Sequence, residues 1–545
     1  MTAPEAARGV RLVNGAVWTG RAERPWAAGL ELRGGRVAAL LGASREPAAG
    51  PAAARSGAGG RSAPELDLRG RAVLPGLVDA HVHLLPWARR RAWLDLRDAP
   101  DLAAVQRTLA AAAAALAPGE WLLAHGFHPA SLGAARPHRA QLDAALPGRP
   151  VYIVTHDSHA AWASSEALRL AGVGRATADP PEGRLERDAR GEPTGFLFES
   201  ARELVTRHIP APGAAREQEL LEAGQREAHR LGVTSVHSFE GASEWRALQR
   251  LREAGRLTLR VVHMFPRAEL PAYLEAGLRA GFGDERLRLG GLKLFADGTL
   301  GLRTAKMHQP YAAGGTGEWA VPPAELAELA GRAAAAGLGV AIHAIGDAAV
   351  GAALDALEAA RRQGAVPLRV EHVQILARAD LPRFAAAGIA ASVQPVHFVT
   401  DRELAQAQWG ERCALAYAWG PLAAAGAELV FGTDAPIEAL DPWATLAAAT
   451  APGGPGTPAH HPARAVGLAQ ALEAMTRAPF RAMGLAGGEL CPGAPADLVV
   501  LDRGARDLES GGERGTIRPQ LTLVDGRAVH ATGDFAGLAG ELARA

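Results

Sequence analysis

The stretch LGGLKLFADG, residues 289–298, combines the features that decide the fold. It is an apolar run of strand length that carries one charged side chain, Lys293, and ends in an Asp-Gly turn. Seven further apolar runs alternate with alanine-rich, helix-like segments; they lie at 72–84, 232–239, 257–265, 337–347, 367–376, 388–398 and 427–436. Eight strands that alternate with helices predict a (β/α)8 barrel, or TIM barrel.

The two ends of the chain have a different sequence pattern. VRLVNGAVWTG (10–20), ADLVVLDRG (496–504) and LTLVDGRAVHATG (521–533) contain short strands separated by Asn-Gly and Asp-Gly turns. We therefore predict one small β domain assembled from residues 1–74 and 486–545, with the barrel at 75–485. The first two barrel strands are too far apart for a βα loop, which predicts an inserted subdomain at about 86–228.

Composition excludes several classes of partner. The 58 basic and 58 acidic residues balance, so nothing suggests a nucleic-acid or anionic-membrane partner. The two cysteines are too few for a disulfide framework and are typical of a reducing cytosol. No apolar run reaches membrane-spanning length, and the N-terminus lacks a signal-peptide pattern. We expect a cytoplasmic protein that acts on a small molecule.

Polar residues fall where the predicted strands end. In a barrel of this kind the carboxyl ends of the strands meet at the active-site face. His81 and His83 are two residues apart, so on a strand they point to the same side and form half of a metal site. His343, His372 and Asp434 each interrupt an apolar run in the same way. Singly, each could be a core histidine or a capping aspartate, but together their order favours a metal centre.

Lys293 is informative because the chain hardly uses lysine. Of 58 basic residues only Lys293 and Lys306 are lysines, in a composition typical of GC-rich coding. A neutral amine can react with carbon dioxide to form a carbamate that bridges two metal ions, whereas a guanidinium cannot. Burial beside cations would lower the pKa of Lys293 and favour the neutral amine. The alternative is an unmodified Lys293 paired with Asp297 or Asp434.

The order of these motifs resembles the amidohydrolase superfamily, specifically its amidohydrolase 3 or YtcJ-like branch. The resemblance covers nearly the whole chain and rests on LPGLVDAHVHL, THDSHAAWASSEAL, LKLFADGTLGLRTA, AIHAIGDAAV, VEHVQIL, VQPVHF, FGTDAPIEALDPW and ELCPGAPADLVVLD. It implies a distorted (β/α)8 barrel, a composite β-sandwich and a centre of one or two metal ions. A homodimer is usual for such folds.

The resemblance also implies residue roles. His81, His83 and Asp434 would hold a first metal, His343 and His372 a second, and carboxylated Lys293 would bridge them. Zinc is the expected metal, with iron, manganese or cobalt as alternatives. Such a metal generates hydroxide near neutral pH, and Asp434 would act as general base and acid in the hydrolysis of a C–N amide-type bond. The second metal, or an imidazole such as His397, would polarise the substrate carbonyl.

Other polar residues are weaker candidates. His156, Asp157 and His159 could line the substrate mouth or belong to the structure of the insertion. Arg303 is a plausible clamp for a substrate carboxylate, although GLRTA here replaces the Gly-Ser-Arg usual in the branch. The branch also usually has a Val-Asn pair where this chain has WASS. Glu371 neighbours His372, so on a regular strand it should point away from the barrel centre.

Two other functions remain open. A metal-dependent deaminase of a heterocycle usually has a glutamate three residues after the fifth-strand histidine and no bridging lysine. Here AIGD follows His343 and Lys293 is present, and both features favour the amidohydrolase. A metal-free binding module would be expected to lose ligands, whereas every ligand position is filled.

Overall fold

The computed structural model describes residues 9–42, 64–132, 136–156, 160–180, 183–453, 462–510 and 514–539. The chain divides into two compact units, residues 1–87 with 221–545 and residues 88–220. Of the proposed substrate contacts, Asp157 and His159 lie outside the described residues.

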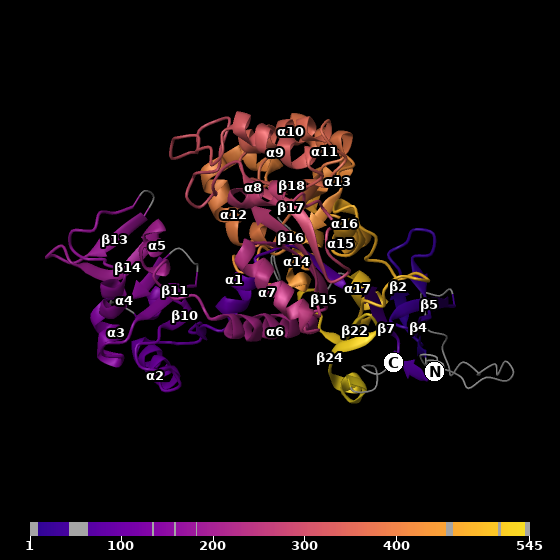
Figure 1. The fold of residues 1–545 in the computed structure, drawn as a ribbon, viewed down its shortest axis with the longest axis horizontal. Coiled ribbons are helices and arrows are strands. Elements are labelled where there is room, and N and C mark those ends of the chain that lie inside the picture. Colours follow the sequence, from indigo (N-terminus) through magenta and orange to yellow (C-terminus); the bar gives the residue numbers. More distant parts are fainter. Residues whose placement is uncertain are drawn as a thin grey trace. The chain divides into compact units, whose positions relative to one another are not determined.

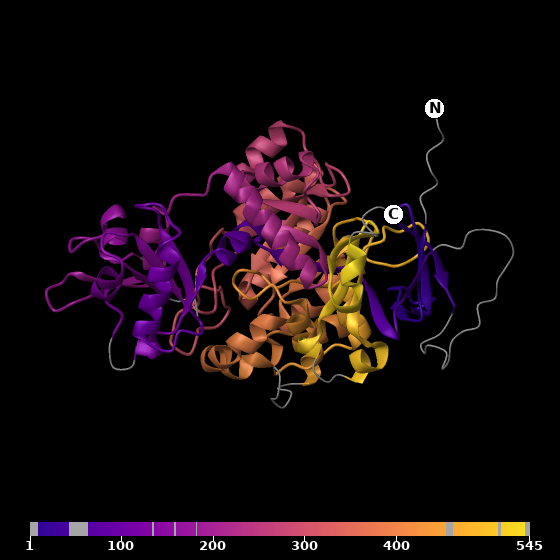
Figure 2. The ribbon, with the colours of Figure 1, turned by 90° about the horizontal axis from the view of Figure 1, so that it is seen from below.

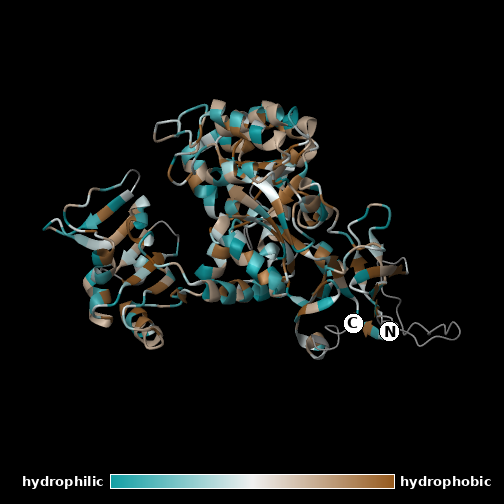
Figure 3. Cartoon of the chain, viewed as in Figure 1, coloured by the Kyte–Doolittle hydropathy of each residue, from teal (hydrophilic) through white to brown (hydrophobic). Residues whose placement is uncertain are grey.

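The first unit contains the predicted barrel. Eight parallel strands form one sheet in the order β21-β20-β19-β18-β17-β16-β15-β8. Their bounds are β8 (Leu77–Val82), β15 (Val233–Phe239), β16 (Arg260–Pro266), β17 (Leu287–Phe295), β18 (Gly339–Ala344), β19 (Leu368–His372), β20 (Ala390–Val393) and β21 (Leu429–Phe431). Six of the strands fall inside the runs predicted from the sequence; β16 extends one residue past its run, and β17 begins two residues before its run. Figure 3 shows hydrophobic residues along the strands. The (β/α)8 fold is confirmed.

The barrel closes between its first and last strands near their carboxyl ends. Val82 forms a parallel bridge with Ala435, and the backbone N–H of His83 donates to the carbonyl of Ala435 (2.8 Å). Gly432 permits this approach, because a Cβ there would lie 2.4 Å from the backbone nitrogen of His81. Closure therefore brings the His-x-His motif beside the loop that carries Asp434.

Helices surround the strands of this unit (Figure 1). Their bounds are α1 (Leu84–Arg91), α6 (Ala214–Arg230), α7 (Ala242–Glu253), α8 (Leu270–Glu275), α9 (Pro323–Ala335), α10 (Asp347–Arg361), α11 (Leu381–Ala387), α12 (Pro395–Trp409), α13 (Trp419–Ala424), α14 (Pro442–Thr450), α15 (Leu468–Ala474), α16 (Arg477–Ala482) and α17 (Ala505–Ser510). None of the described helices is long and apolar enough to cross a membrane.

Strands from both chain ends form two further sheets, and Figure 2 shows the indigo and yellow segments side by side. The four-stranded sheet contains β1 (Val10–Val13), β4 (Gly29–Arg33), β5 (Arg36–Leu41) and β6 (Glu65–Asp67). The six-stranded sheet contains β2 (Ala16–Trp18), β3 (Trp26–Ala27), β7 (Arg71–Pro75), β22 (Leu498–Gly504), β23 (Pro519–Val524) and β24 (Arg527–Ala531). Leu12 and Leu30 from the first sheet share one buried cluster with Val73 and Val500 from the second.

The unit at 88–220 has a mixed sheet in the order β13-β14-β12-β11-β10-β9. Neighbouring residues of its central strand alternate between two cores, with Ile153 in one and Tyr152 in the other. The elements are β9 (Leu94–Asp95), β10 (Leu122–Phe127), β11 (Val151–Thr155), β12 (Ala160–Ala163), β13 (Gly183–Arg187), β14 (Pro193–Glu199), α2 (Leu102–Ala113), α3 (Arg139–Ala145), α4 (Ser165–Leu170) and α5 (Glu203–Thr206).

Candidate metal centre

The His-x-His motif is fixed at the carboxyl end of β8. His81 is buried within the strand and His83 follows its last residue. Asp79 accepts a hydrogen bond from the backbone N–H of His81 (3.2 Å). The other contacts of Asp79 come from Thr433, whose N–H and hydroxyl donate at 3.0 and 2.5 Å. This buried carboxylate therefore ties the motif to the loop after β21.

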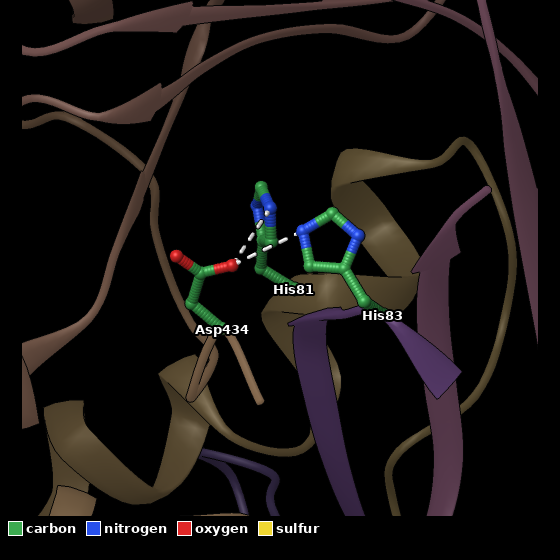
Figure 4. Close-up of side chains that lie close together, drawn as sticks. All are labelled: His81, His83 and Asp434. Carbon is green, nitrogen blue, oxygen red and sulfur yellow. Dashed lines mark ion pairs between the residues drawn. The ribbon is translucent and has the colours of Figure 1, made fainter. Parts of the chain in front are cut away.

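Asp434 faces both histidines of the motif (Figure 4). Its backbone has φ of +60°, and its N–H donates to the carbonyl of His81 (2.8 Å). Oδ1 of Asp434 lies 3.6 Å from Nε2 of His81 and 3.4 Å from Nε2 of His83. One donor atom from each of the three residues lies within 4.8 Å of the others, close enough to share a metal ion.

A second group of donors consists of His372, His397 and Asp434. Nε2 of His397 lies 3.7 Å from Oδ2 of Asp434, and its ring is stacked parallel to that of His372. The family resemblance implied that His343 holds the second metal together with His372. His343 instead contacts His372 ring to ring (4.5 Å between centroids), and its Nε2 lies 3.0 Å from the carbonyl of Gly298.

A β-bulge directs Lys293 into the barrel. Residues 289 and 291 of β17 pair with consecutive residues of β16, so Gly290 is an extra residue in the ladder. Gly291 has φ of +151°, and a Cβ there would lie 2.0 Å from the carbonyl oxygen of Gly339. Only glycine fits this position, and the bulge changes which side chains of β17 face inward.

Lys293 lies in an apolar part of the interior. Its Nζ is 4.6 Å from the ring centroid of Phe239 and 5.1 Å from that of Phe295. Burial lowers the pKa of Lys293 to about 8, so a minor fraction of the amine is neutral near neutral pH. No described carboxylate forms an ion pair with Lys293, so the alternative of pairing with Asp297 or Asp434 is absent from the structure.

Three of the four imidazoles in the two donor groups are held at Nδ1 by a side-chain oxygen. The contacts are Glu371 Oε2 to His81 (2.6 Å), Glu240 Oε1 to His83 (2.8 Å) and Gln394 Oε1 to His372 (2.8 Å). An oxygen acceptor at Nδ1 keeps the ring proton there and leaves the Nε2 lone pair for a metal. The rings are therefore oriented as metal ligands need to be.

Glu371 corrects the sequence prediction. The chain leaves regular strand geometry at His372 and Val373, which have φ of +74° and +45°. Glu371 and His372 consequently both face the barrel interior, although they are adjacent in the chain. The guanidinium of Arg369 donates to Glu371 through Nε (2.5 Å to Oε1) and Nη2 (3.0 Å to Oε2). All three side chains are buried.

Arg369 spans the interior. It starts on β19 and donates from Nη1 to Nδ1 of His237 on β15 (2.8 Å). Its Nη2 donates to the carbonyl of Ala80 on β8 and to the hydroxyl of Ser392 on β20 (both 2.7 Å). Every guanidinium nitrogen thus has an acceptor, which is what a buried arginine requires. Nothing in the local sequence pattern indicated this network, because its members come from four strands.

The charges of the centre are strongly coupled. Burial alone raises the pKa of Asp434, but the hydrogen bond from His83 and the nearby His81, His372 and His397 outweigh it and lower the pKa. Burial lowers the pKa of His83, yet its bonds to Asp434 and Glu240 prevail and raise it to about 10. Burial lowers the pKa of His81 to about 4. Before a metal binds, these shifts favour a second ring proton on His83 beside the ionised Asp434 carboxylate.

Asp297, in the turn after β17, binds the backbone of the neighbouring loops. Its carboxylate accepts backbone N–H groups from Lys306 (2.8 Å), Ile345 (3.0 Å) and Gly346 (2.8 Å). Burial raises the pKa of Asp297 to about 7. These three bonds anchor the loops after β17 and β18.

Arg303 and His156 have other surroundings. Arg303 follows β17 with φ of +57°, and no described residue forms a side-chain hydrogen bond or ion pair with it. His156 is exposed in the unit at 88–220, where its ring stacks on His128 (4.3 Å between centroids). Among the described residues, no side-chain contact therefore links Arg303 to the metal centre.

The donor set fits a divalent metal. Nδ1 of His343 and Nε2 of His397 are buried and have no hydrogen-bond partner among the described residues. Buried polar atoms without partners are costly, and a bound ion or its coordinated water would satisfy them. Imidazole nitrogens together with a carboxylate are the ligands that zinc, iron, manganese and cobalt accept.

Comparison with known proteins agrees with this geometry. The model of the amidohydrolase family matches residues 65–530. The chain belongs to this family. This amidohydrolase is 30% identical over 394 residues to the putative amidohydrolase YtcJ of Bacillus subtilis. The alignment covers 69% of this chain and 73% of the relative. This chain is also 29% identical over 562 residues to an N-substituted formamide deformylase of Arthrobacter pascens, covering 95% and 98% of the two chains.

A solved structure shows the same architecture. An uncharacterized metal-dependent hydrolase from Pyrococcus furiosus superposes on this amidohydrolase with a TM-score of 0.73 and 29% identity. The match covers 91% of this chain and 99% of the other. The chain is therefore a metal-dependent hydrolase of the YtcJ-like branch.

Proposed function

We propose that this amidohydrolase hydrolyses a C–N amide-type bond in an amide, a formamide or a cyclic amide, and that N-substituted formamides are the first class to test. The observation that carries the proposal is the convergence of His81, His83, His372 and His397 on the Asp434 carboxylate. The bond class draws support from the formamide deformylase, whose sequence aligns with nearly the whole chain.

In this proposal His81, His83, His372 and Asp434 hold one or two divalent ions, with zinc as the first candidate. A bound ion of this kind lowers the pKa of water from about 15.7 towards about 7 and so supplies a nucleophile at neutral pH. Glu371 and Glu240 orient the ring nitrogens of His81 and His83 for this task.

Asp434 moves the proton. Asp434 is ionised at neutral pH, which leaves a carboxylate oxygen available to accept the proton of the attacking water. The water oxygen then bonds to the carbonyl carbon, the C–N bond breaks, and Asp434 returns the proton to the departing amine nitrogen. Nε2 of His397 is buried, without a described partner and 3.7 Å from Oδ2 of Asp434, which suits a group that polarises the substrate carbonyl.

Lys293 is proposed to be carboxylated. Burial lowers the pKa of Lys293 to about 8, although the charges of Glu371 and Asp434 oppose this shift, so part of the amine is neutral, as addition to carbon dioxide requires. Addition of the neutral amine to carbon dioxide forms an N–C bond and releases one proton. Counted from the ammonium form, two protons are released, and a cationic side chain becomes an anionic one with two oxygens. Such a carbamate could join the imidazoles in holding metal.

The test is a hydrolysis screen of purified protein with zinc, manganese or cobalt supplied. N-substituted formamides, simple amides and cyclic amides are compared, with formate or other acid and amine measured together. We expect one class to release acid and amine in equal amounts, and chelation to abolish the reaction. Ammonia release from heterocyclic amines without amide hydrolysis would indicate a deaminase. Less than one metal per chain, with no effect of chelation, would indicate a binding module.

A further inference from the structure

A second pocket lies at the amino ends of the barrel strands, away from the metal centre. Its volume is about 550 Å³, which suits a small molecule. The walls come from the starts of β15, β16 and β17 and from the segment 484–497 that leads into the β-sandwich. None of the residues proposed to hold metal lines this pocket.

Two buried polar side chains line the pocket, and each has one polar atom without a hydrogen-bond partner among the described residues. Ser235 and His237 are two residues apart on β15 and are 3% and 2% exposed. Oγ of Ser235 has no hydrogen-bond partner among the described residues. Nδ1 of His237 accepts from Arg369, which can only donate, so the ring proton of a neutral His237 is on Nε2. Within the described chain nothing accepts that proton.

The charges of the pocket lining are formally balanced, with three arginines (Arg36, Arg260 and Arg288) and three carboxylates (Glu285, Glu489 and Asp497). Glu285 pairs with Arg36 (3.4 Å) and Arg260 (3.8 Å), Asp497 with Arg260 (2.5 Å), and Glu489 with Arg21 (3.9 Å), which lies outside the lining. Arg288, at the start of β17, also lines the pocket, and no described residue forms an ion pair with it. Its guanidinium is therefore available in the same pocket as the Ser235 hydroxyl and the His237 ring.

We propose that this pocket binds a small oxyanion, a carboxylate or a phosphate, through Nε2–H of His237, the hydroxyl of Ser235 and the guanidinium of Arg288. Oxygen acceptors would satisfy both buried donors, and a guanidinium binds carboxylate and phosphate oxygens in a bidentate manner. The occupant would also contact the network that positions the metal ligands, because His237 is bonded to Arg369, which holds Glu371 and thereby His81.

Calorimetric titration of the full-length, metal-loaded protein with inorganic phosphate and with acetate tests the proposal. We expect Ser235→Ala and Arg288→Gln each to weaken binding about tenfold or more without changing metal content. Arg279→Gln, which changes an exposed arginine outside the pocket, is the matched control and should bind like the wild type. Tighter binding of phosphate or of acetate identifies the class of oxyanion.

An anion held at the metal centre would bind both pocket variants as tightly as the wild type, and that result would overturn the proposal. If neither phosphate nor acetate binds, the proposal is overturned as well. Alkylation of the wild-type protein gives a second measurement, because Cys491 lines the pocket whereas Cys413 is buried elsewhere. Saturating anion should slow alkylation of Cys491 but not of Cys413. An unchanged Cys491 rate would place the bound anion outside the pocket.

Discussion

Nδ1 of His81 lies 2.6 Å from Oε2 of Glu371, although β8 and β19 are not neighbours in the barrel sheet. Arg369 balances the charge of Glu371 and also reaches the carbonyl of Ala80, beside His81. The pair crosses the barrel interior and fixes which nitrogen of His81 faces Asp434. This relationship links the packing of the barrel directly to the proposed metal site.

Replacing Glu371 tests that link. Glu371→Gln keeps the shape of the side chain but removes the charge that favours Nδ1–H of His81. We expect the affinity for zinc to fall about 10–100-fold, as is typical when a carboxylate behind a ligating histidine is lost. Competition with a chromogenic chelator measures this affinity. Ser392→Ala, which removes one contact of Arg369 but leaves Glu371 in place, is the matched control and should keep wild-type affinity.

The same substitution should affect stability. Without Glu371, Arg369 remains buried with no counter-charge, which costs about 3–5 kcal/mol in the free energy of unfolding. Denaturant unfolding of metal-free protein measures this cost separately from metal affinity. If Glu371→Gln has the wild-type free energy of unfolding and the wild-type affinity for zinc, Glu371 neither positions His81 nor balances the charge of Arg369.

Replacing Asp434 tests the proton transfer. Asp434→Asn retains an oxygen that can face a metal but cannot accept the proton of water at neutral pH. We expect kcat for the substrate found in the screen to fall about 10²–10⁴-fold, the usual contribution of general acid–base catalysis. Asp355→Asn, which changes an aspartate that is 74% exposed, should leave kcat unchanged. Wild-type kcat in Asp434→Asn would remove this residue from the mechanism.

The two lysines allow a matched test of carboxylation. Lys293→Arg keeps a long cationic side chain that cannot form a carbamate, and we expect loss of both metal content and activity. Lys306→Arg is the control, since Nζ of Lys306 donates to Thr316 and to the carbonyl of Gly317 rather than to the metal centre. Metal analysis and the hydrolysis assay report the result. Full metal content and activity in Lys293→Arg would rule out the carbamate.

Acid should destabilise the fold through buried histidines. Burial lowers the pKa of His229 to about 4 and that of His263 to about 3, whereas both titrate near 6.5 when unfolded. Below about pH 6.5 these two histidines bind protons in the unfolded chain but not in the folded chain. The stability present at higher pH is therefore lost as the pH falls. Each histidine contributes a slope of up to about 1.4 kcal/mol per pH unit until its folded pKa is reached.

Urea unfolding between pH 7.5 and 4.5 measures this slope. We expect His229→Gln to reduce the slope by up to about 1.4 kcal/mol per pH unit, the contribution of one proton, because glutamine does not titrate. His208→Gln, at an exposed position, is the control and should leave the slope as in the wild type. An unchanged slope in His229→Gln would show that this ring titrates alike in both states.

The eight barrel strands could be read from the sequence because each is a short apolar run between loop or helix signals. The ends that carry His81, His83, His343, His372 and Asp434 could be read as well, since polar residues there interrupt the pattern. The position of Glu371 could not, because its inward orientation depends on the positive φ of His372 rather than on strand alternation.

The sequence by itself determined the order of strands and helices and indicated the candidate metal ligands and the rare lysine, because these depend on local periodicity and side-chain chemistry. Only the tertiary structure decided which donors converge. Barrel closure places Asp434 against His81 and His83, and the bulge at Gly290 turns Lys293 inward. The network of Arg369 and the pocket at Ser235 likewise join residues far apart in the chain, and only packing can specify such contacts.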